Sequence, residues 1–319
     1  MNILFFGSSE ISVPFLEEIY SSRHKIAQVV TTADKPAGRG RKTVPNIVKK
    51  RAAVLGVNFI QIEKFDDNFF KEFKKLKFDA AVVVSFGRIL PEKIFKLTTA
   101  RWFNMHPSLL PRYRGPTPII STLLNGDDVG GISIIEVVNE VDAGGIYAQV
   151  KFRVEKDDNR DSLEQKSIRF GMSLLIAVLD LVESKNLKSY PQGGDNIVYS
   201  HKIAKEDLKI NWNKGAVEIV NKIRAFSLKP GAYSMWRNLR IKILKAGVID
   251  KDTYPYKLKA TRGEKNGSVV EADRGKGILV KCGKNGILKI ELLQLQGKKA
   301  MPAADFINGY RLKAGGSFE

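Results

Sequence analysis

Residues 102–115 read WFNMHPSLLPRYRG, an apolar extended segment that runs into a turn rich in proline and arginine. Side chains alternate between the two faces of a strand, so Asn104 and His106 point the same way. Two prolines and Gly115 then end the strand and turn the chain. The run therefore predicts two hydrogen-bond donors at the rim of a sheet, which is where open α/β folds bind ligands.

The residues before this run alternate short apolar segments with helical patterns. Four segments are typical of buried parallel strands: Ile3–Gly7, Ile26–Thr31, Asn58–Ile62 and Ala80–Ser85. Amphipathic helices are expected between them, over Val13–Ser21, Ile47–Leu55 and Asp67–Leu76. This rhythm predicts right-handed crossovers and a doubly wound, Rossmann-like α/β sheet. After it we expect strands at Ile132–Val138 and Ile146–Val154 and a long helix at Ser162–Glu183.

The pattern changes in the last third of the chain. Residues 185–201 are polar and rich in glycine, which is typical of a linker. After Asp207 a helix over Lys214–Ala225 precedes five short β runs with glycine turns, at Ala232–Trp236, Arg240–Val248, Gly267–Ala272, Gly277–Lys281 and Gly286–Leu295. Such runs predict a small barrel of the oligonucleotide-binding type. The predicted domains are residues 1–188 and 207–319, with a linker at 189–206.

Composition excludes several protein classes. The chain has 319 residues, 43% of them hydrophobic, and no apolar run approaches the roughly 20 residues that span a bilayer. Its first residues, MNILFFG, lack the features of a signal peptide and are typical of a first strand. Cys282 is the only cysteine, so an internal disulfide and a cysteine metal cluster are excluded. We expect a cytoplasmic protein without a membrane partner, and a monomer, because no heptad or apolar interface stripe is present.

The positive charge is large and unevenly distributed. The net charge is +19; residues 205–319 carry 24 Lys/Arg against 11 Asp/Glu, a net of +13, and the preceding residues carry +6. A second basic segment, residues 33–42 (ADKPAGRGRK), follows the second predicted strand and holds Lys35, Arg39, Arg41 and Lys42. Both features indicate a polyanionic partner such as nucleic acid, with phosphate contacts from this loop. The alternative is a lysine-biased composition and a solvated loop with no role in binding.

Residues after the other strands complete a possible site. Gly7-Ser8-Ser9-Glu10 lacks the glycines of a dinucleotide-binding turn. Gly87, after the fourth strand, can expose backbone groups to a flat heterocycle that Ile89 and Leu90 would wall. Asp142 lies in the turn NEVDAGG at residues 139–145. It is either a turn-forming residue or a carboxylate that approaches His106 and favours its charged form.

These residues favour one reaction class over others. Ser108 lacks the elbow motif of a serine nucleophile, and Cys282 lies in the other predicted domain. One His, one Asp and one Asn make a poor zinc set, so no metal is expected. What remains is acyl transfer in which the substrate supplies the nucleophile. An amide and an imidazolium would stabilise the oxyanion, and the carboxylate would assist proton transfer.

The chain resembles the folate-dependent formyltransferases nearly end to end. The residues that carry the resemblance are Asn104-x-His106, Ser108-Leu109-Leu110-Pro111, Arg114-Gly115 and Asp142-x-Gly144. The basic loop at 34–40, Tyr199–Ile203, Ile210–Trp212, Arg224–Phe226 and Gly297–Met301 resemble those members that formylate the methionine of initiator tRNA. The chain departs from the family with Gly7-Ser8-Ser9 in place of Gly-Thr-Pro, and with Gly130-Gly131-Ile132-Ser133 in place of Thr-Gly-Val-Thr.

The resemblance implies a function and a set of residues. It implies formyl transfer from 10-formyltetrahydrofolate to initiator methionyl-tRNA, with Asn104, His106 and Asp142 catalytic. The residues that it places in the folate site are Ser108, Leu109, Leu110, Pro111, Phe86, Gly87, Ile89, Leu90, Val138 and Asn139. The basic loop would reach the acceptor stem of the tRNA through Lys35, Arg39, Arg41 and Lys42. Two alternatives stay open: a small amine acceptor such as a ribonucleotide or amino sugar, and an RNA-binding protein that has lost catalysis.

Overall fold

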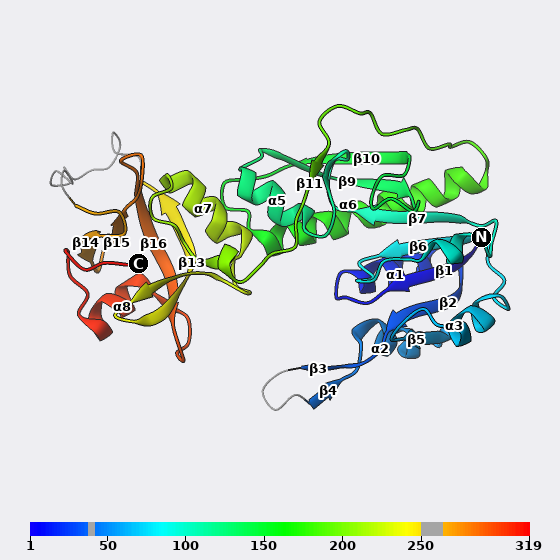
Figure 1. The fold of residues 1–319 in the computed structure, drawn as a ribbon, viewed down its shortest axis with the longest axis horizontal. Coiled ribbons are helices and arrows are strands. Elements are labelled where there is room, and N and C mark those ends of the chain that lie inside the picture. The colour runs from blue at the N-terminus through cyan, green and yellow to red at the C-terminus, as the bar shows by residue number, and fades with distance from the viewer. Residues whose placement is uncertain (38–41, 250–263) are drawn as a thin grey trace. The chain divides into compact units, whose positions relative to one another are not determined.

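The computed structural model describes residues 1–37, 42–249 and 264–319, which form two compact units (Figure 1). Unit 1 comprises residues 1–118, 129–153 and 164–200, and unit 2 comprises residues 119–128, 154–163 and 201–319. The predicted domains, 1–188 and 207–319, are each continuous in sequence. Residues 119–128 and 154–163, by contrast, belong to unit 2 by their contacts. The units are defined by contacts alone, so the predicted domain limits stay a prediction.

Unit 1 is built on a seven-stranded sheet in the order β10-β9-β7-β6-β1-β2-β5. The strands are β1 (Asn2–Gly7), β2 (Lys25–Thr32), β5 (Phe59–Ile62), β6 (Ala80–Val84), β7 (Arg101–His106), β9 (Val129–Glu136) and β10 (Ile146–Arg153). Those from β5 to β7 are parallel, and β9 pairs antiparallel with both β7 and β10. β1 lies between β2 and β6, so the chain reverses its direction of progress there. Loops after β1 and β6 flank that switch point, where α/β sheets bind ligands.

Helices cover both faces of this sheet, as the doubly wound prediction requires. One face packs against α1 (Ser12–Ser21), α2 (Ile47–Val54) and α6 (Arg160–Glu183), and the other against α3 (Asp67–Phe73) and α4 (Glu92–Phe95). Asn46 caps α2 by accepting from the Val48 and Lys49 amides, and Asp66 caps α3 by accepting from the Phe69 amide. These side chains satisfy N–H groups that a helix start leaves without partners.

Unit 2 contains an antiparallel sheet in the order β12-β13-β16-β15-β14, with β17 paired to β16. Its elements are η1 (Glu206–Leu208), α7 (Ala216–Ala225), β12 (Ala232–Trp236), β13 (Leu239–Val248), β14 (Val269–Asp273), β15 (Gly277–Lys281), β16 (Ile287–Leu295), β17 (Met301–Pro302) and α8 (Ala303–Tyr310). The chain end bonds to both edge strands: Glu319 exchanges backbone hydrogen bonds with Met235 of β12, and Gly315 and Gly316 bond to Val269 of β14. These bonds connect the two edges of the sheet.

Several short elements were not predicted. They are β3 (Lys35–Ala37), β4 (Lys42–Val44), α4, β8 (Arg112–Arg114), α5 (Pro118–Asn125), β11 (Val198–Tyr199), η1, β17 and α8. Two- or three-residue strands carry no periodicity, and the apolar, partly β-branched sequence of α5 is ambiguous between helix and strand. Within the ranges that the structure describes, no helix has the length and apolar character needed to cross a bilayer.

Candidate active site

Asn104 and His106 lie on one face at the carboxyl end of β7. β7 is held between β6 and β9, with Asn104 opposite Ile135 and His106 opposite Ser133. His106 is buried, and Asn104 is half-buried. The two side chains are thus carried by a strand fixed on both sides, which limits their movement.

Asp142 approaches both of them from the connection between β9 and β10. Its Oδ1 accepts from Asn104 Nδ2 at 3.3 Å, and its Oδ2 lies 3.5 Å from His106 Nδ1. The Gly115 amide donates to the same Oδ2 at 2.8 Å. The structure therefore brings the three predicted catalytic side chains together, although Asp142 is 36 residues from His106 in the chain. Asp142 has a φ of 53°, a left-handed conformation that aspartate tolerates better than most residues.

Both ring nitrogens of His106 face acceptors. Nε2 lies 3.0 Å from the carbonyl oxygen of Tyr113, and Nδ1 faces the Asp142 carboxylate. Tyr113 itself has a φ of 63°, and it follows the proline turn that the sequence predicted. With a carbonyl on one side and a carboxylate on the other, each nitrogen of the ring can act as a donor. The Tyr113 carbonyl could not be predicted from the sequence, because a backbone acceptor leaves no signal in residue type.

A buried network holds the turn after His106. The Ser133 hydroxyl donates to the Ser108 carbonyl at 2.7 Å and accepts from the Leu110 amide at 3.1 Å. Gln149 Nε2 donates to Ser133 Oγ at 2.8 Å and to the Leu110 carbonyl at 3.0 Å. Ser133 thus uses its donor and both acceptor positions inside the protein.

The four predicted folate residues of this turn differ in exposure. Ser108 is buried and its hydroxyl donates to the Arg112 carbonyl at 2.7 Å, so it shapes the turn. Leu110 packs in a small core with Ile135 and Ile146. Leu109 and Pro111 are half-buried. A Cβ on Gly131 would come within 2.3 Å of Leu109 Cδ2, so glycine at this position makes room for the leucine.

The predicted folate residues after β6 lie at the switch point of the sheet. Phe86 is buried and packs edge-on against Phe6, so its side chain belongs to the core. Its carbonyl accepts a hydrogen bond from the Ser8 hydroxyl. Gly87, with a φ of 73°, and Ile89 are exposed, and Leu90 is half-buried. The backbone of this segment and the Ile89 and Leu90 side chains are thus the parts available to a ligand.

The last two predicted folate residues, Val138 and Asn139, are exposed after β9. Asn139 hydrogen-bonds to the Glu92 carboxylate, which also pairs with Lys96 at 2.6 Å. The interaction with Lys96 is the largest cause that lowers the pKa of Glu92, and the hydrogen bond with Asn139 lowers it further. The Asn139–Glu92 bond therefore links the segment after β9 to the start of α4.

Comparison with known proteins shows the family of this chain. Two family models match the chain: Formyl transferase over residues 1–179, and Formyl transferase, C-terminal domain, over residues 202–311. Proteins named methionyl-tRNA formyltransferase are 37% identical in Sulfurihydrogenibium sp. and 39% identical in Dictyoglomus thermophilum, with 100% of both chains covered in each case. The chain belongs to the methionyl-tRNA formyltransferase family.

Solved structures of lower identity share the fold of this family member. The N-formyltransferase from Helicobacter canadensis, in complex with folinic acid and dTDP-3-aminofucose, is 21% identical, with a TM-score of 0.65 over 91% of this chain and 98% of that one. HypX from Aquifex aeolicus, in complex with tetrahydrofolic acid, is 17% identical, with a TM-score of 0.64 over 97% of this chain and 47% of that one.

The basic segment of this family member is a hairpin and not the predicted loop. β3 and β4 pair antiparallel on either side of residues 38–41, so Lys35 lies on β3 and Lys42 on β4. Lys35 is exposed. Arg39 and Arg41 lie outside the described residues. Pro36 did not prevent pairing, because a proline is tolerated in a short ribbon where its missing N–H costs no ladder bond.

Asp34 anchors the base of this hairpin. Its carboxylate accepts from Lys49 Nζ at 2.8 Å, from the Asn46 amide at 2.9 Å and from Gln61 Nε2 at 2.7 Å. The Lys49 bond, with those of Asn46 and Gln61, lowers the pKa of Asp34 to about 2. A rigid base would limit the positions that the basic residues of the hairpin can reach.

This pKa predicts a specific loss of stability in acid. An unfolded aspartate has a pKa of about 3.9, so the folded state gains stability from the Asp34 charge above that pH. The gain is lost as pH falls from about 4 through the folded value of about 2. In thermal melts, Asp34→Asn should lower Tm at pH 7 and flatten the decline in Tm between pH 4 and pH 2. A variant whose Tm follows the wild-type curve at every pH would contradict this assignment.

Cysteine chemistry is not available in this family member at neutral pH. Cys282 is buried in the core of unit 2, and burial raises the pKa of its thiol to about 12. The thiol therefore stays protonated and is a poor nucleophile.

One group of side chains in the part of the chain that the structure describes has the spacing of metal ligands: His24, Asp180 and Glu183. Arg23 pairs with Asp180 at 2.5 Å and with Glu183 at 2.7 Å, and the Met1 amine bonds to Glu183 at 2.7 Å. Both carboxylates are thus already paired with cationic groups of the protein. The group is an ion-pair network, and it contains none of the predicted catalytic residues.

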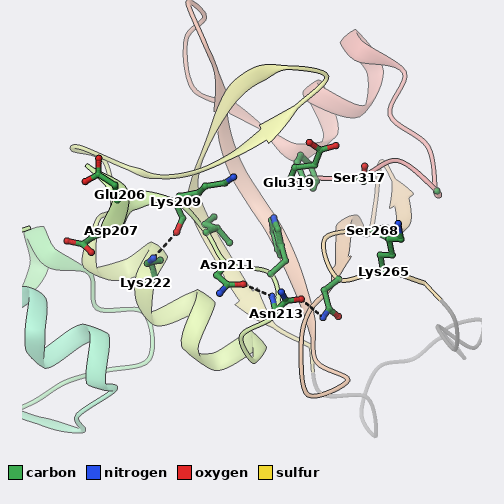
Figure 2. Close-up of a pocket in the computed structure, with 15 residues that line it drawn as sticks. Glu206, Asp207, Lys209, Asn211, Asn213, Lys222, Lys265, Ser268, Ser317 and Glu319 are labelled. Atoms are coloured by element: carbon green, nitrogen blue, oxygen red, sulfur yellow. Dashed lines mark hydrogen bonds between the residues drawn. The ribbon is translucent and has the colours of Figure 1, made fainter. Parts of the chain in front are cut away.

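Unit 2 contains a polar hollow of about 1010 Å³ (Figure 2). Its charged lining residues are Lys209, Lys222, Lys265, Glu206, Asp207 and Glu319. Lys222 Nζ donates to the Lys209 carbonyl at 2.8 Å, and burial lowers the pKa of Lys222. Lysines and carboxylate side chains balance in this lining, so the hollow does not concentrate positive charge. None of the predicted site residues lines it.

Proposed function

We propose that this protein transfers a formyl group from 10-formyltetrahydrofolate to the α-amino group of methionine on initiator tRNA, for translation initiation. The observation that carries the proposal is the convergence of Asn104 Nδ2, His106 Nδ1 and the Asp142 carboxylate on one spot. These groups supply donors and a base, and they include no protein nucleophile. Such a set fits a reaction in which the acceptor amine itself attacks.

The two donors stabilise the charge that develops on the formyl oxygen. The Asn104 carboxamide has two N–H groups; one faces Asp142, which leaves the second for the substrate. His106 is fixed by its Nε2 contact with Tyr113, so its Nδ1 edge, beside the Asp142 carboxylate, is the one left to donate to the formyl oxygen. Donors aimed at a developing oxyanion in a site with little water are usually the largest single contribution to catalysis.

Asp142 acts as the base that transfers the proton of the reaction. A bond forms between the methionine nitrogen and the formyl carbon, and the bond from that carbon to the folate nitrogen breaks. The attacking nitrogen must lose a proton, and the leaving nitrogen must gain one. Asp142 accepts the proton of the attacking nitrogen, directly or through a water molecule, and returns it to the leaving folate nitrogen; its contact with His106 holds the ring in place.

Three segments around this centre support a folate site. They are the turn at 108–111, the segment 86–90 at the switch point, and residues 138–139, which the Asn139–Glu92 bond brings beside residues 86–92. Gly87 and Val138 expose backbone groups, and Ile89 and Leu90 offer apolar surface for a flat ring. The formyl donor supplies the one-carbon group, and these segments orient it.

A tRNA acceptor predicts a strong dependence on salt. Lys35 lies on β3 and Lys42 on β4, and residues 205–319 add a net charge of +13. The double variant Lys35→Ala/Lys42→Ala should raise KM for tRNA and leave kcat nearly unchanged. It should also reduce the slope of log KM against log salt by about 1 for each lysine–phosphate interaction that it removes.

The matched control is Lys71→Ala/Lys74→Ala, which removes two exposed lysines from the end of α3. Its KM and salt slope should equal those of the wild type. Equal salt slopes for the hairpin variant and this control would refute the hairpin as a tRNA contact.

The second candidate function keeps the chemistry and changes the acceptor to a small amine. It is favoured by the fold shared with a structure that contains dTDP-3-aminofucose. Steady-state assays with methionyl-tRNA and with an amino-sugar nucleotide, each with 10-formyltetrahydrofolate, separate the two. We expect turnover with the tRNA only, catalysed by a monomer without a metal ion. Turnover with the sugar only would select the alternative.

A further inference from the structure

Gln192 links two parts of the candidate site that are far apart in sequence. Its Nε2 donates to the Asp142 carbonyl and to the Gly144 carbonyl, each at 2.8 Å. Its Oε1 accepts from Arg114 Nε at 3.0 Å and from Arg114 Nη2 at 2.9 Å. A carboxamide has two N–H donors and an oxygen with two acceptor positions, so Gln192 uses all of them here.

The backbone of residues 142–144, to which Gln192 bonds, is also restricted by its own conformation and by its contact with β9. Asp142 has a φ of 53°, in a left-handed region that few non-glycine residues adopt. Gly144 passes so close to β9 that a Cβ would come within 1.8 Å of the Glu136 carbonyl oxygen. The carbonyls of Asp142 and Gly144 both accept from the Gln192 amide. Gln192 thereby holds the backbone of the loop that carries the Asp142 carboxylate.

The other side of Gln192 meets a buried charge. The Arg114 side chain is 7% exposed, and its ion pair with Glu140, at 3.2 Å, reaches a carboxylate that is 67% exposed. Arg114 is followed directly by Gly115, whose amide donates to Asp142 Oδ2. Gln192 therefore connects the segment that carries the Gly115 donor to the loop that carries the acceptor. A buried guanidinium without this oxygen would lose two hydrogen bonds.

Neighbouring residues show why the segment can hold this position. Tyr190 exchanges backbone hydrogen bonds with Ile146 at the start of β10, and Val198–Tyr199 form β11 beside β8. The Ser200 amide donates to the Arg114 carbonyl at 2.7 Å. Residues 190–200, expected to be part of a linker, are thus tied to unit 1 on both sides of Gln192.

We propose that Gln192 is a positioning residue for formyl transfer, which acts by fixing the Asp142 carboxylate relative to His106 and Asn104. The inference rests on the function proposed above. A displacement of about 1 Å in a catalytic group can cost up to about 100-fold in rate. Gln192→Ala should therefore lower kcat by roughly 10- to 100-fold and leave KM for both substrates close to the wild-type values.

Gln192→Glu separates positioning from simple charge neutralisation of Arg114. The carboxylate can still accept from Arg114, but it cannot donate to the two carbonyls. We expect Gln192→Glu to remain folded, with a lower Tm because two hydrogen bonds are lost, and to lose kcat as Gln192→Ala does. If Gln192→Glu restored wild-type kcat, the role of Gln192 would be to neutralise Arg114, and the proposal would be overturned.

Hydrogen exchange provides a readout that does not depend on the reaction. In Gln192→Ala, backbone amides of residues 137–145 should exchange faster than in the wild type. Gln294→Ala is the matched control: Gln294 is a half-buried glutamine in unit 2 whose Nε2 donates to the Lys298 carbonyl at 2.8 Å. It should change neither this exchange nor kcat.

The outcomes distinguish this inference from the proposed function. If the wild-type protein forms no formylated methionyl-tRNA, the proposed function fails, and exchange at 137–145 still decides whether Gln192 holds the loop. Unchanged exchange in Gln192→Ala would overturn the inference. Faster exchange with a wild-type kcat would also overturn it, because the loop would then be held without consequence for the reaction.

Discussion

His106→Ala is expected to lower kcat for formyl transfer by at least about 100- to 1000-fold, the usual effect of losing one oxyanion donor. The variant removes the donor at Nδ1 and the side chain that joins Asp142 to the Tyr113 carbonyl. Single-turnover rates with saturating substrates would measure the chemical step without product release. KM for tRNA should change little, because the basic hairpin is untouched.

Folding must be checked separately for this variant, since His106 is 4% exposed. Its Tm and its binding of tetrahydrofolate by calorimetry should both remain measurable. If the folded variant that binds folate retained a rate within a few-fold of the wild type, His106 would have no catalytic role.

Asp142→Asn is expected to produce a loss of at least about 100-fold in kcat. Asparagine tolerates a left-handed backbone, so the loop can keep the φ of 53° that Asp142 has. The amide oxygen can still accept the Gly115 hydrogen bond, but the NH2 group can no longer accept from Asn104, take a proton or attract the His106 ring by charge. A loss of rate in this variant therefore reports the carboxylate, with its charge and its second acceptor oxygen, and not the shape of the loop.

Asp79→Asn is a suitable control for this charge change. Asp79 is exposed before β6, at the opposite end of the strands from the site, and its Oδ2 accepts from the Asn2 amide at 2.6 Å. We expect wild-type turnover from it. Similar rates for Asp142→Asn and Asp79→Asn would remove Asp142 from the mechanism.

The parts of the fold predicted from sequence are those with a strong local pattern. Ala80–Val84 is apolar throughout, which predicts a parallel strand buried on both faces, and β6 is such a strand. α6 keeps its apolar stripe over 24 residues. The spacing of Asn104 and His106 predicted that both side chains lie on one face of a strand. The proline turn after them predicted that this strand, β7, ends at this point.

What escaped prediction depends on contacts between residues far apart in the chain. Gln192 meets Asp142 across 50 positions and Arg114 across 78, and nothing in the polar run around Gln192 marks it. Ser133 and Gln149 act through a buried network whose members are 16 to 39 residues apart. β11 is two residues long and exists because β8 lies beside it. The predicted domain limits and site residues likewise depend on contacts between distant residues, which the sequence alone does not provide.

The central claim is that Asn104, His106 and Asp142 catalyse formyl transfer to methionine on initiator tRNA. The most direct test measures formyl-methionine released from tRNA after incubation of the wild-type protein and His106→Ala with 10-formyltetrahydrofolate and charged initiator or elongator methionyl-tRNA. We predict rapid formylation of the initiator tRNA by the wild type, slow formylation of the elongator, and a loss of at least about 100-fold in His106→Ala. Absence of product with the wild type, or an equal rate in His106→Ala, would contradict the account.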